Sequence, residues 1–153
     1  MTEAESYARY IVSSIDHLLE CLTGLDAAGL NWRPAAPDAN SLFAMAAHAI
    51  ENCAENVLGT ACGVPMYQGR ETEAEFGASS DAVTPLLNRW NQVRADIQTF
   101  LPTLSAEELA EERVHPRRGA ITTREVLLVA ARHAAEHYGQ AQLTRDLWLA
   151  ARV

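Results

Sequence analysis

The stretch TTREVLLVAARHAAEHYGQAQLTRDLWLA, residues 122–150, decides the fold class. It begins with Thr122 and Glu125 at the spacing of a capping box, in which each side chain caps the other residue's backbone N–H. Apolar residues then recur at helical spacing, which predicts a helix of roughly 40 Å at 1.5 Å per residue. A glycine inside a helix costs about 1 kcal/mol relative to alanine, so we expect Gly139 to have a packing or site role.

Three further long segments show the same helical periodicity, and almost no part of the chain looks like a strand. The expected helices cover residues 2–24, 41–60 and 84–101. Four long amphipathic helices are typical of a bundle, in which each helix buries its apolar face against the others. The sequence therefore predicts an all-α four-helix bundle, in one domain that spans residues 1–153.

Short signals mark the ends of these helices and the segment before the last one. Asp38 or Asn40 is the expected cap of the second helix. The third helix is expected to begin near Ser80 or Thr84, with Thr84 as its cap if Pro85 is the first helical residue. Residues 105–112 begin with another capping box and predict a short helix. Residues 114–121 contain a proline and a glycine, so we expect a small hairpin or turn there.

The composition excludes several classes of function. The 153 residues include 20 acidic and 12 basic side chains, and the formal charge of −8 argues against general binding to nucleic acid. All 12 basic residues are arginines, so Schiff-base chemistry, which needs a lysine amine, is excluded. The chain is long enough to bury a core without help from a metal or a disulfide.

The three cysteines and the N-terminus bear on the compartment. Cys21, Cys53 and Cys62 form no C-x-x-C pair, so we expect neither a disulfide framework nor a thiolate metal site. The acidic N-terminus lacks the apolar segment of a signal peptide, and no apolar run approaches the roughly 20 residues that span a bilayer. We expect a reduced, cytoplasmic protein with no membrane partner.

The chemistry of the chain is concentrated in its histidines. His133 and His137 are four residues apart in the last helix, so both imidazoles lie on one face, one turn apart. Their stripe includes apolar residues and should face inward. His48, in the middle of the second helix, is the third candidate, because bundles build metal sites from inward side chains on facing helices. Three imidazoles with an open fourth position would form a catalytic type of metal site.

Other interpretations of the histidines stay open at this point. An H-x-x-x-H pair often arises by chance, and an inward histidine such as His48 is often only a hydrogen-bonded core residue. His133–His137 also matches the H-x-x-E-H pattern of inverted zinc proteases, but the 16 residues that follow offer only Asp146 as a further acidic ligand. We expect His17 to be exposed and His115 to be solvated in a turn.

Five arginines lie between residues 113 and 132, against the single acid Glu125, and this local charge contrasts with the acidic whole. They are Arg113, Arg117, Arg118, Arg124 and Arg132. Guanidinium groups suit carboxylates and phosphates, so the cluster could hold an anionic cofactor. The simpler interpretation is that most of them pair with four nearby acids on the surface: Glu107, Glu108, Glu111 and Glu112.

Two motifs together resemble the DinB/YfiT-like family of metalloenzymes. The first is Leu30-Asn31-Trp32-Arg33-Pro34, followed by Asn40-Ser41 and then His48, and the second is His133-Ala134-Ala135-Glu136-His137-Tyr138-Gly139-Gln140. The resemblance extends over essentially the whole chain. It implies a bundle with up-down-down-up topology and a divalent metal, most often zinc or nickel, on His48, His133 and His137. It also implies a homodimer.

The resemblance leaves the reaction open. Family members of known activity are mostly thiol-dependent: glutathione, mycothiol or bacillithiol S-transferases and a maleylpyruvate isomerase. The first hypothesis is therefore a metal-dependent S-transferase or isomerase that uses a low-molecular-weight thiol on a small-molecule substrate. The second is a metal-dependent hydrolase, with Glu51 or Glu136 as its base and Asn52 or Gln140 orienting water. The third is a non-enzymatic, stress-related dimer in which the ion links two helices.

Overall fold

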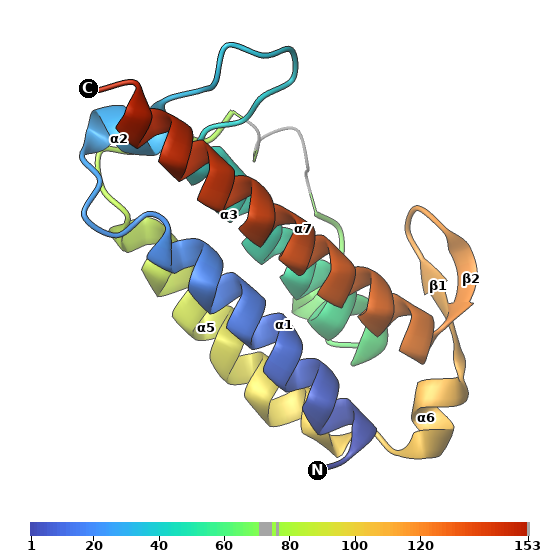
Figure 1. Cartoon of the computed structure of the whole chain (residues 1–153). Helices are drawn as coiled ribbons and strands as arrows, with labels where there is room; N and C mark the ends of the chain where they lie inside the picture. Colours follow the sequence, from blue (N-terminus) through green and yellow to red (C-terminus); the bar gives the residue numbers. More distant parts are fainter. Residues whose placement is uncertain (71–74, 76, 153) are drawn as a thin grey trace.

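Four long helices lie side by side in the computed structural model, which describes residues 1–70, 75 and 77–152 (Figure 1). They are α1 (Glu3–Glu20), α3 (Leu42–Cys53), α5 (Thr84–Phe100) and α7 (Thr123–Ala150). Followed from the N-terminus, α1 and α7 run in one direction and α3 and α5 in the other (Figure 1). The predicted all-α bundle and its up-down-down-up topology are both confirmed.

Capping boxes begin two of these helices as the sequence predicts. The hydroxyl of Thr122 accepts the backbone N–H of Glu125, and the Glu125 carboxylate accepts the backbone N–H of Thr122. Thr2 and Glu5 do the same for α1. Each box satisfies two backbone donors that the first turn of a helix leaves unpaired.

The expected caps of the other two helices are wrong. The hydroxyl of Ser41 accepts the backbone N–H of Ala44, so Ser41 caps α3 in place of Asp38 or Asn40. Asp38 instead lies in the preceding turn with a φ of 60°. The third helix already includes Thr84, and no side chain caps it.

Shorter elements connect the long helices. They are α2 (Ala27–Asn31), η1 (Ala54–Ala61), η2 (Pro65–Tyr67), η3 (Leu101–Thr103), α6 (Ala106–Ala110), β1 (Glu112–His115) and β2 (Gly119–Thr122). The two strands pair antiparallel, with Val114 opposite Ala120, and β2 leads directly into α7. This confirms the predicted hairpin and places it beside the start of α7 (Figure 1).

The second long helix changes its winding halfway. From Ala54 to Ala61 it continues α3 as a π-helix, which has a wider turn than an α-helix. This segment, η1, is almost entirely buried, and it carries the buried polar residues Glu55 and Asn56. π-helical turns are frequent at functional sites, and this one places the carboxylate of Glu55 and the amide of Asn56 in the interior.

The core lies between the inward faces of the long helices. Ile11, Ile15 and Leu18 of α1 are completely buried, and so are Val126 and Leu127 of α7. Gly139 of α7 does not pack closely against another residue, because a Cβ built on it would meet no atom within 4 Å. The packing role expected for this glycine is therefore wrong. Within the described residues, no helix is long and apolar enough to cross a membrane.

Candidate metal centre

Three histidines from two facing helices meet at one point. His48 lies on α3, while His133 and His137 lie one turn apart on α7. The Nε2 atom of His133 is 3.0 Å from Nε2 of His48 and 3.1 Å from Nε2 of His137. His48 is buried, and the other two are half-buried. The predicted triad is thus brought together in space by the packing of α3 against α7.

These separations fit a shared metal ion. Two nitrogens at about 2.0–2.1 Å from one ion would be about 2.9 Å apart at a right angle and about 3.4 Å apart at the tetrahedral angle. The observed 3.0 and 3.1 Å lie within this range. Imidazole nitrogens are good ligands for zinc, nickel, iron and copper. His48, His133 and His137 could therefore hold a divalent metal.

Hydrogen-bond acceptors behind two of the rings favour the tautomer that a metal needs. Oε2 of Glu75 lies 3.1 Å from Nδ1 of His48, and Oε1 of Gln140 lies 2.8 Å from Nδ1 of His137. A ring that donates its Nδ1–H to such an oxygen presents the lone pair of Nε2 to an ion. The same arrangement fixes the orientation of both rings.

The Glu75 carboxylate is itself held by a buried arginine. Nε and Nη2 of Arg70 donate to the two oxygens of Glu75, each over 2.5 Å. Nη2 also lies 2.9 Å from Nδ1 of His48. A guanidinium can only donate, so it competes with Glu75 for Nδ1, and only the bond to Glu75 leaves Nε2 unprotonated.

The environment keeps the histidines neutral. Burial lowers the pKa of His48 to about 3, with the charge of Arg70 as the next cause. Burial also lowers the pKa of His133 to about 3, with His137 as the next cause. The pKa of His137 is lowered by burial too. Neutral imidazole is the form that binds metals, so the site is in its binding form at neutral pH.

The other two histidines lie outside this cluster. His17 is exposed, as predicted, and its ring lies 5.4 Å from that of Tyr138. The expectation that His115 is solvated is wrong, because only 3% of it is exposed. It lies in β1 and faces η1, where its Nε2 is 2.8 Å from Oδ1 of Asn56. This bond joins the hairpin to the helix that follows His48.

The structure also distinguishes among the candidate polar partners. Glu136 is exposed and pairs with Arg132 over 3.2 Å, so it lies on a solvated helix face. Glu51 forms a two-point ion pair with Arg89, over 2.5 and 2.8 Å. Glu75, which contacts the candidate metal ligand His48, was not predicted from the sequence. It lies in a connecting segment without periodicity, so no pattern relates it to His48.

A cavity of about 280 Å³ opens beside the histidines. Its lining includes His48 and His133 of the triad, together with Asn52 of α3 and Asn56 of η1. Nδ2 of Asn56 donates to Oδ1 of Asn52 over 2.8 Å, so these two amides form a continuous polar wall with His115. A small molecule in this cavity would lie directly against two of the three imidazoles.

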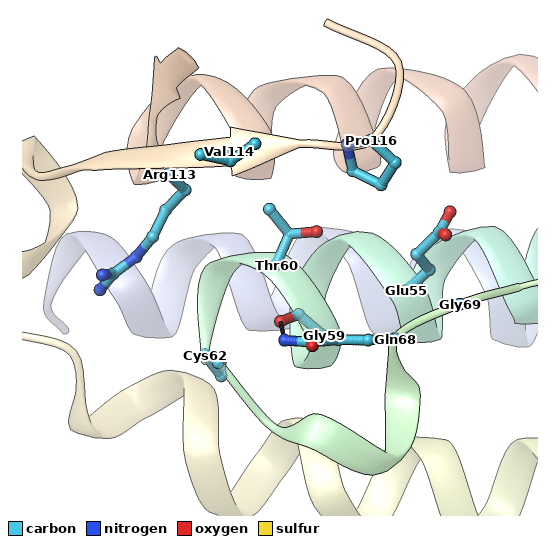
Figure 2. Close-up of a pocket in the computed structure, with 10 residues that line it drawn as sticks. Glu55, Gly59, Thr60, Cys62, Gln68, Gly69, Arg113, Val114 and Pro116 are labelled. Atoms are coloured by element: carbon cyan, nitrogen blue, oxygen red, sulfur yellow. Dashed lines mark hydrogen bonds between the residues drawn. The ribbon is translucent and has the colours of Figure 1, made fainter. Parts of the chain in front are cut away.

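A second and larger cavity, of about 480 Å³, lies between η1 and β1. Figure 2 shows Thr60 of η1 and Val114 of β1 on its facing sides, with Cys62 at the end of the helix. None of its lining residues is a histidine. Burial raises the pKa of the Cys62 thiol to about 12, so this cysteine is not an activated nucleophile.

Fold and site together define a four-helix bundle protein with three inward histidines beside a small polar cavity. The family model of the DinB superfamily matches residues 10–141, and the chain belongs to that superfamily. The fold is also similar to the crystal structure of a conserved protein from Enterococcus faecalis. That match has a TM-score of 0.73 and 19% identity, and it covers 96% of this chain and 97% of the other. A comparison with curated proteins found no match.

Proposed function

We propose that this protein is a metal-dependent transferase or isomerase that joins a small thiol to an electrophilic small molecule. The observation that carries the proposal is the convergence of His48, His133 and His137 beside a cavity of about 280 Å³. A site that only linked two helices would need no such space. Zinc or nickel would be held by the three Nε2 atoms. When bound, the ion would act as a Lewis acid that keeps a small thiol in its nucleophilic thiolate form.

The chain's own cysteines are poorly suited to supply that thiolate. Burial raises the pKa of Cys53 and Cys62 to about 12 and also raises the pKa of Cys21. All three therefore stay protonated at neutral pH, and the protonated thiol is a weak nucleophile. This supports a thiol cofactor that comes from solution, as the family resemblance implies.

The proposed reaction is a simple displacement or addition. In a displacement, the thiol proton passes to solvent, the thiolate sulfur forms a bond to an electrophilic carbon, and the leaving group departs from that carbon with the electron pair of its bond. In an addition to a carbon–carbon double bond, the π electron pair moves to the neighbouring carbon, which takes up a proton. In an isomerisation, the thiolate adds, the resulting single bond rotates, and the thiolate then departs with the electron pair of the C–S bond. The hydrolase alternative is less well supported, because Glu51 and Glu136 are both held in ion pairs with arginines. Neither carboxylate is therefore an unpaired base. The expected homodimer stays a prediction, which light scattering of the purified protein would test.

Thiol-transfer assays test the proposal. Zinc- and nickel-loaded protein would be mixed with monochlorobimane and, in turn, glutathione, mycothiol and bacillithiol. We expect metal-dependent formation of the fluorescent thioether with at least one thiol, and its loss in His133→Ala. The matched control is His17→Ala, which removes an exposed histidine of α1 and should keep the activity. Absence of metal-dependent turnover with all three thiols would contradict the proposal.

A further inference from the structure

The cavity beside the histidines is lined by four arginines. Arg70 comes from the segment after η2, Arg117 and Arg118 from the hairpin turn, and Arg132 from α7. Among the described residues that line this cavity there is no carboxylate. Three of these arginines belong to the basic cluster seen in the sequence, and its other two members pair elsewhere: Arg113 with Glu111 and Arg124 with Glu3. Folding thus gathers part of that cluster at the candidate metal centre.

Arg70 is the buried member of the four. Only 5% of its side chain is exposed, and its Nη1 has no hydrogen-bond partner among the described residues. Oε2 of Glu55 is 3.6 Å from Nη1, which is too far for a hydrogen bond. An unsatisfied buried N–H is unfavourable, so this group is poised to donate to a ligand oxygen.

The charges of the described residues around the cavity do not cancel. Arg70 pairs with Glu75, Arg117 pairs with Glu55, and Arg132 pairs with Glu136 at the surface. Arg118 has no ion-pair partner within 4.0 Å in the part of the chain that the structure describes. Within the described residues, the four guanidinium groups thus exceed their three carboxylate partners by one positive charge, and a divalent ion would add two more.

We infer that this cavity binds a carboxylate of the substrate or of the thiol cofactor, next to the metal centre. The surplus positive charge of the described side chains favours an anionic group of the ligand. The planar fork of a guanidinium suits the two oxygens of a carboxylate. Arg118 and Arg132 are exposed and would meet the anion first, while Nη1 of Arg70 would donate from the buried side. This inference rests on the proposed function, because it names the class of substrate or cofactor that the proposed active site would bind.

Two hydroxamate probes that differ only in a distal carboxylate test this inference. Acetohydroxamate and succinate monohydroxamate would be titrated calorimetrically into zinc-loaded protein, so that both bind the metal in the same way. Charge-assisted hydrogen bonds lead us to expect about tenfold tighter binding of the succinate probe to the wild type. In the double variant Arg118→Gln/Arg132→Gln, the two probes should bind about equally.

Arg124→Gln is the matched control, because Arg124 is an arginine of the same helix as Arg132 that does not line the cavity. It should keep the preference for the succinate probe. A wild type that shows no preference, whether both probes bind or neither does, overturns the inference, and so does a preference that survives the double variant. A preference in a protein without thiol-transfer activity would uphold the carboxylate site and contradict the thiol chemistry.

Discussion

At the scale of single residues, the orientation of His48 depends on Glu75. This carboxylate is 8% exposed, receives two hydrogen bonds from Arg70, and lies 3.1 Å from Nδ1 of His48. Partners of this kind raise the basicity of a ligand and hold its tautomer. The candidate metal centre therefore depends on more than its three histidines. The connecting segment between η2 and α5 supplies Glu75, which determines which nitrogen of His48 is available to a metal.

The variant Glu75→Gln should lower the affinity for zinc by about tenfold or more, because the amide is a weaker acceptor and no longer neutralises Arg70. Competition with a chelator of known affinity would measure the change. Glu136→Gln, which alters an exposed acid next to His137, should bind zinc as the wild type does. Equal affinities in all three proteins would show that Glu75 does not orient the ligand.

The cysteines give a second prediction at this scale. At pH 8, Cys53 and Cys62 of the native protein should react with iodoacetamide more than about a hundredfold more slowly than in the urea-unfolded chain, whose thiols have an ordinary pKa of about 8.5. Burial raises the pKa of Cys53 and of Cys62 to about 12, which leaves very little thiolate at pH 8. Mass spectrometry would count the labelled sites. Rapid labelling of Cys53 or Cys62 in the native protein would contradict their described burial.

The raised pKa of the buried cysteines also makes the free energy of unfolding depend on pH. A thiol whose pKa is raised by folding stabilises the native state fully below its unfolded pKa, and this contribution is lost as the pH rises through the folded value. Cys53 is 2% exposed, with its pKa raised to about 12. The free energy of unfolding should therefore decrease between about pH 8.5 and 12, and Cys53→Ser should show a smaller decrease in that interval.

At the scale of elements, two glycines in helices should respond oppositely to substitution. A Cβ at Gly139 of α7 would meet nothing within 4 Å, whereas a Cβ at Gly59 of η1 would lie 2.6 Å from the carbonyl oxygen of Tyr67. Gly139→Ala should therefore raise the free energy of unfolding by about 0.5–1 kcal/mol through its effect on helix propensity. Gly59→Ala should lower it, because backbone must move. Urea denaturation would measure both, and destabilisation by Gly139→Ala would contradict this description of α7.

Sequence patterns predicted the long helices well, because helical periodicity and capping boxes are local signals. The same patterns brought His133 and His137 to one face, and His48 to the middle of the facing helix. Asp38, Asn40 and Ser41 are all residue types that commonly cap helices, and the sequence pattern does not indicate which of them caps α3. Only the register of the helix against the core determines that Ser41 is the cap.

The errors at the site come from contacts between distant segments. His115 was expected in solvent because it precedes a proline in a turn, yet the hairpin turns it against Asn56, 59 positions earlier. Glu75 and Arg70 reach His48 from a segment without periodicity. Such contacts depend on tertiary packing, and a single sequence carries no local signal for them.

At the scale of the whole molecule, the bundle should not need its metal to fold. Helices α1, α3, α5 and α7 already enclose an apolar core, and a chain of this size buries enough surface to be stable. We expect the chelator-treated protein to keep its helical circular dichroism and to melt at a lower temperature than the zinc-loaded form. Zinc at a hundred times its Kd would add about 2.7 kcal/mol of stability. A metal-free protein that is unfolded would instead indicate a structural metal.

The central claim is that His48, His133 and His137 hold one divalent ion. Metal analysis by mass spectrometry of purified wild type, His137→Ala and His17→Ala tests it most directly. We expect about one zinc or nickel ion per chain in the wild type and in His17→Ala, since three nitrogens with an open position form one site. We expect a large loss of metal in His137→Ala. The same substoichiometric metal content in all three proteins would show that the three histidines do not form a metal site.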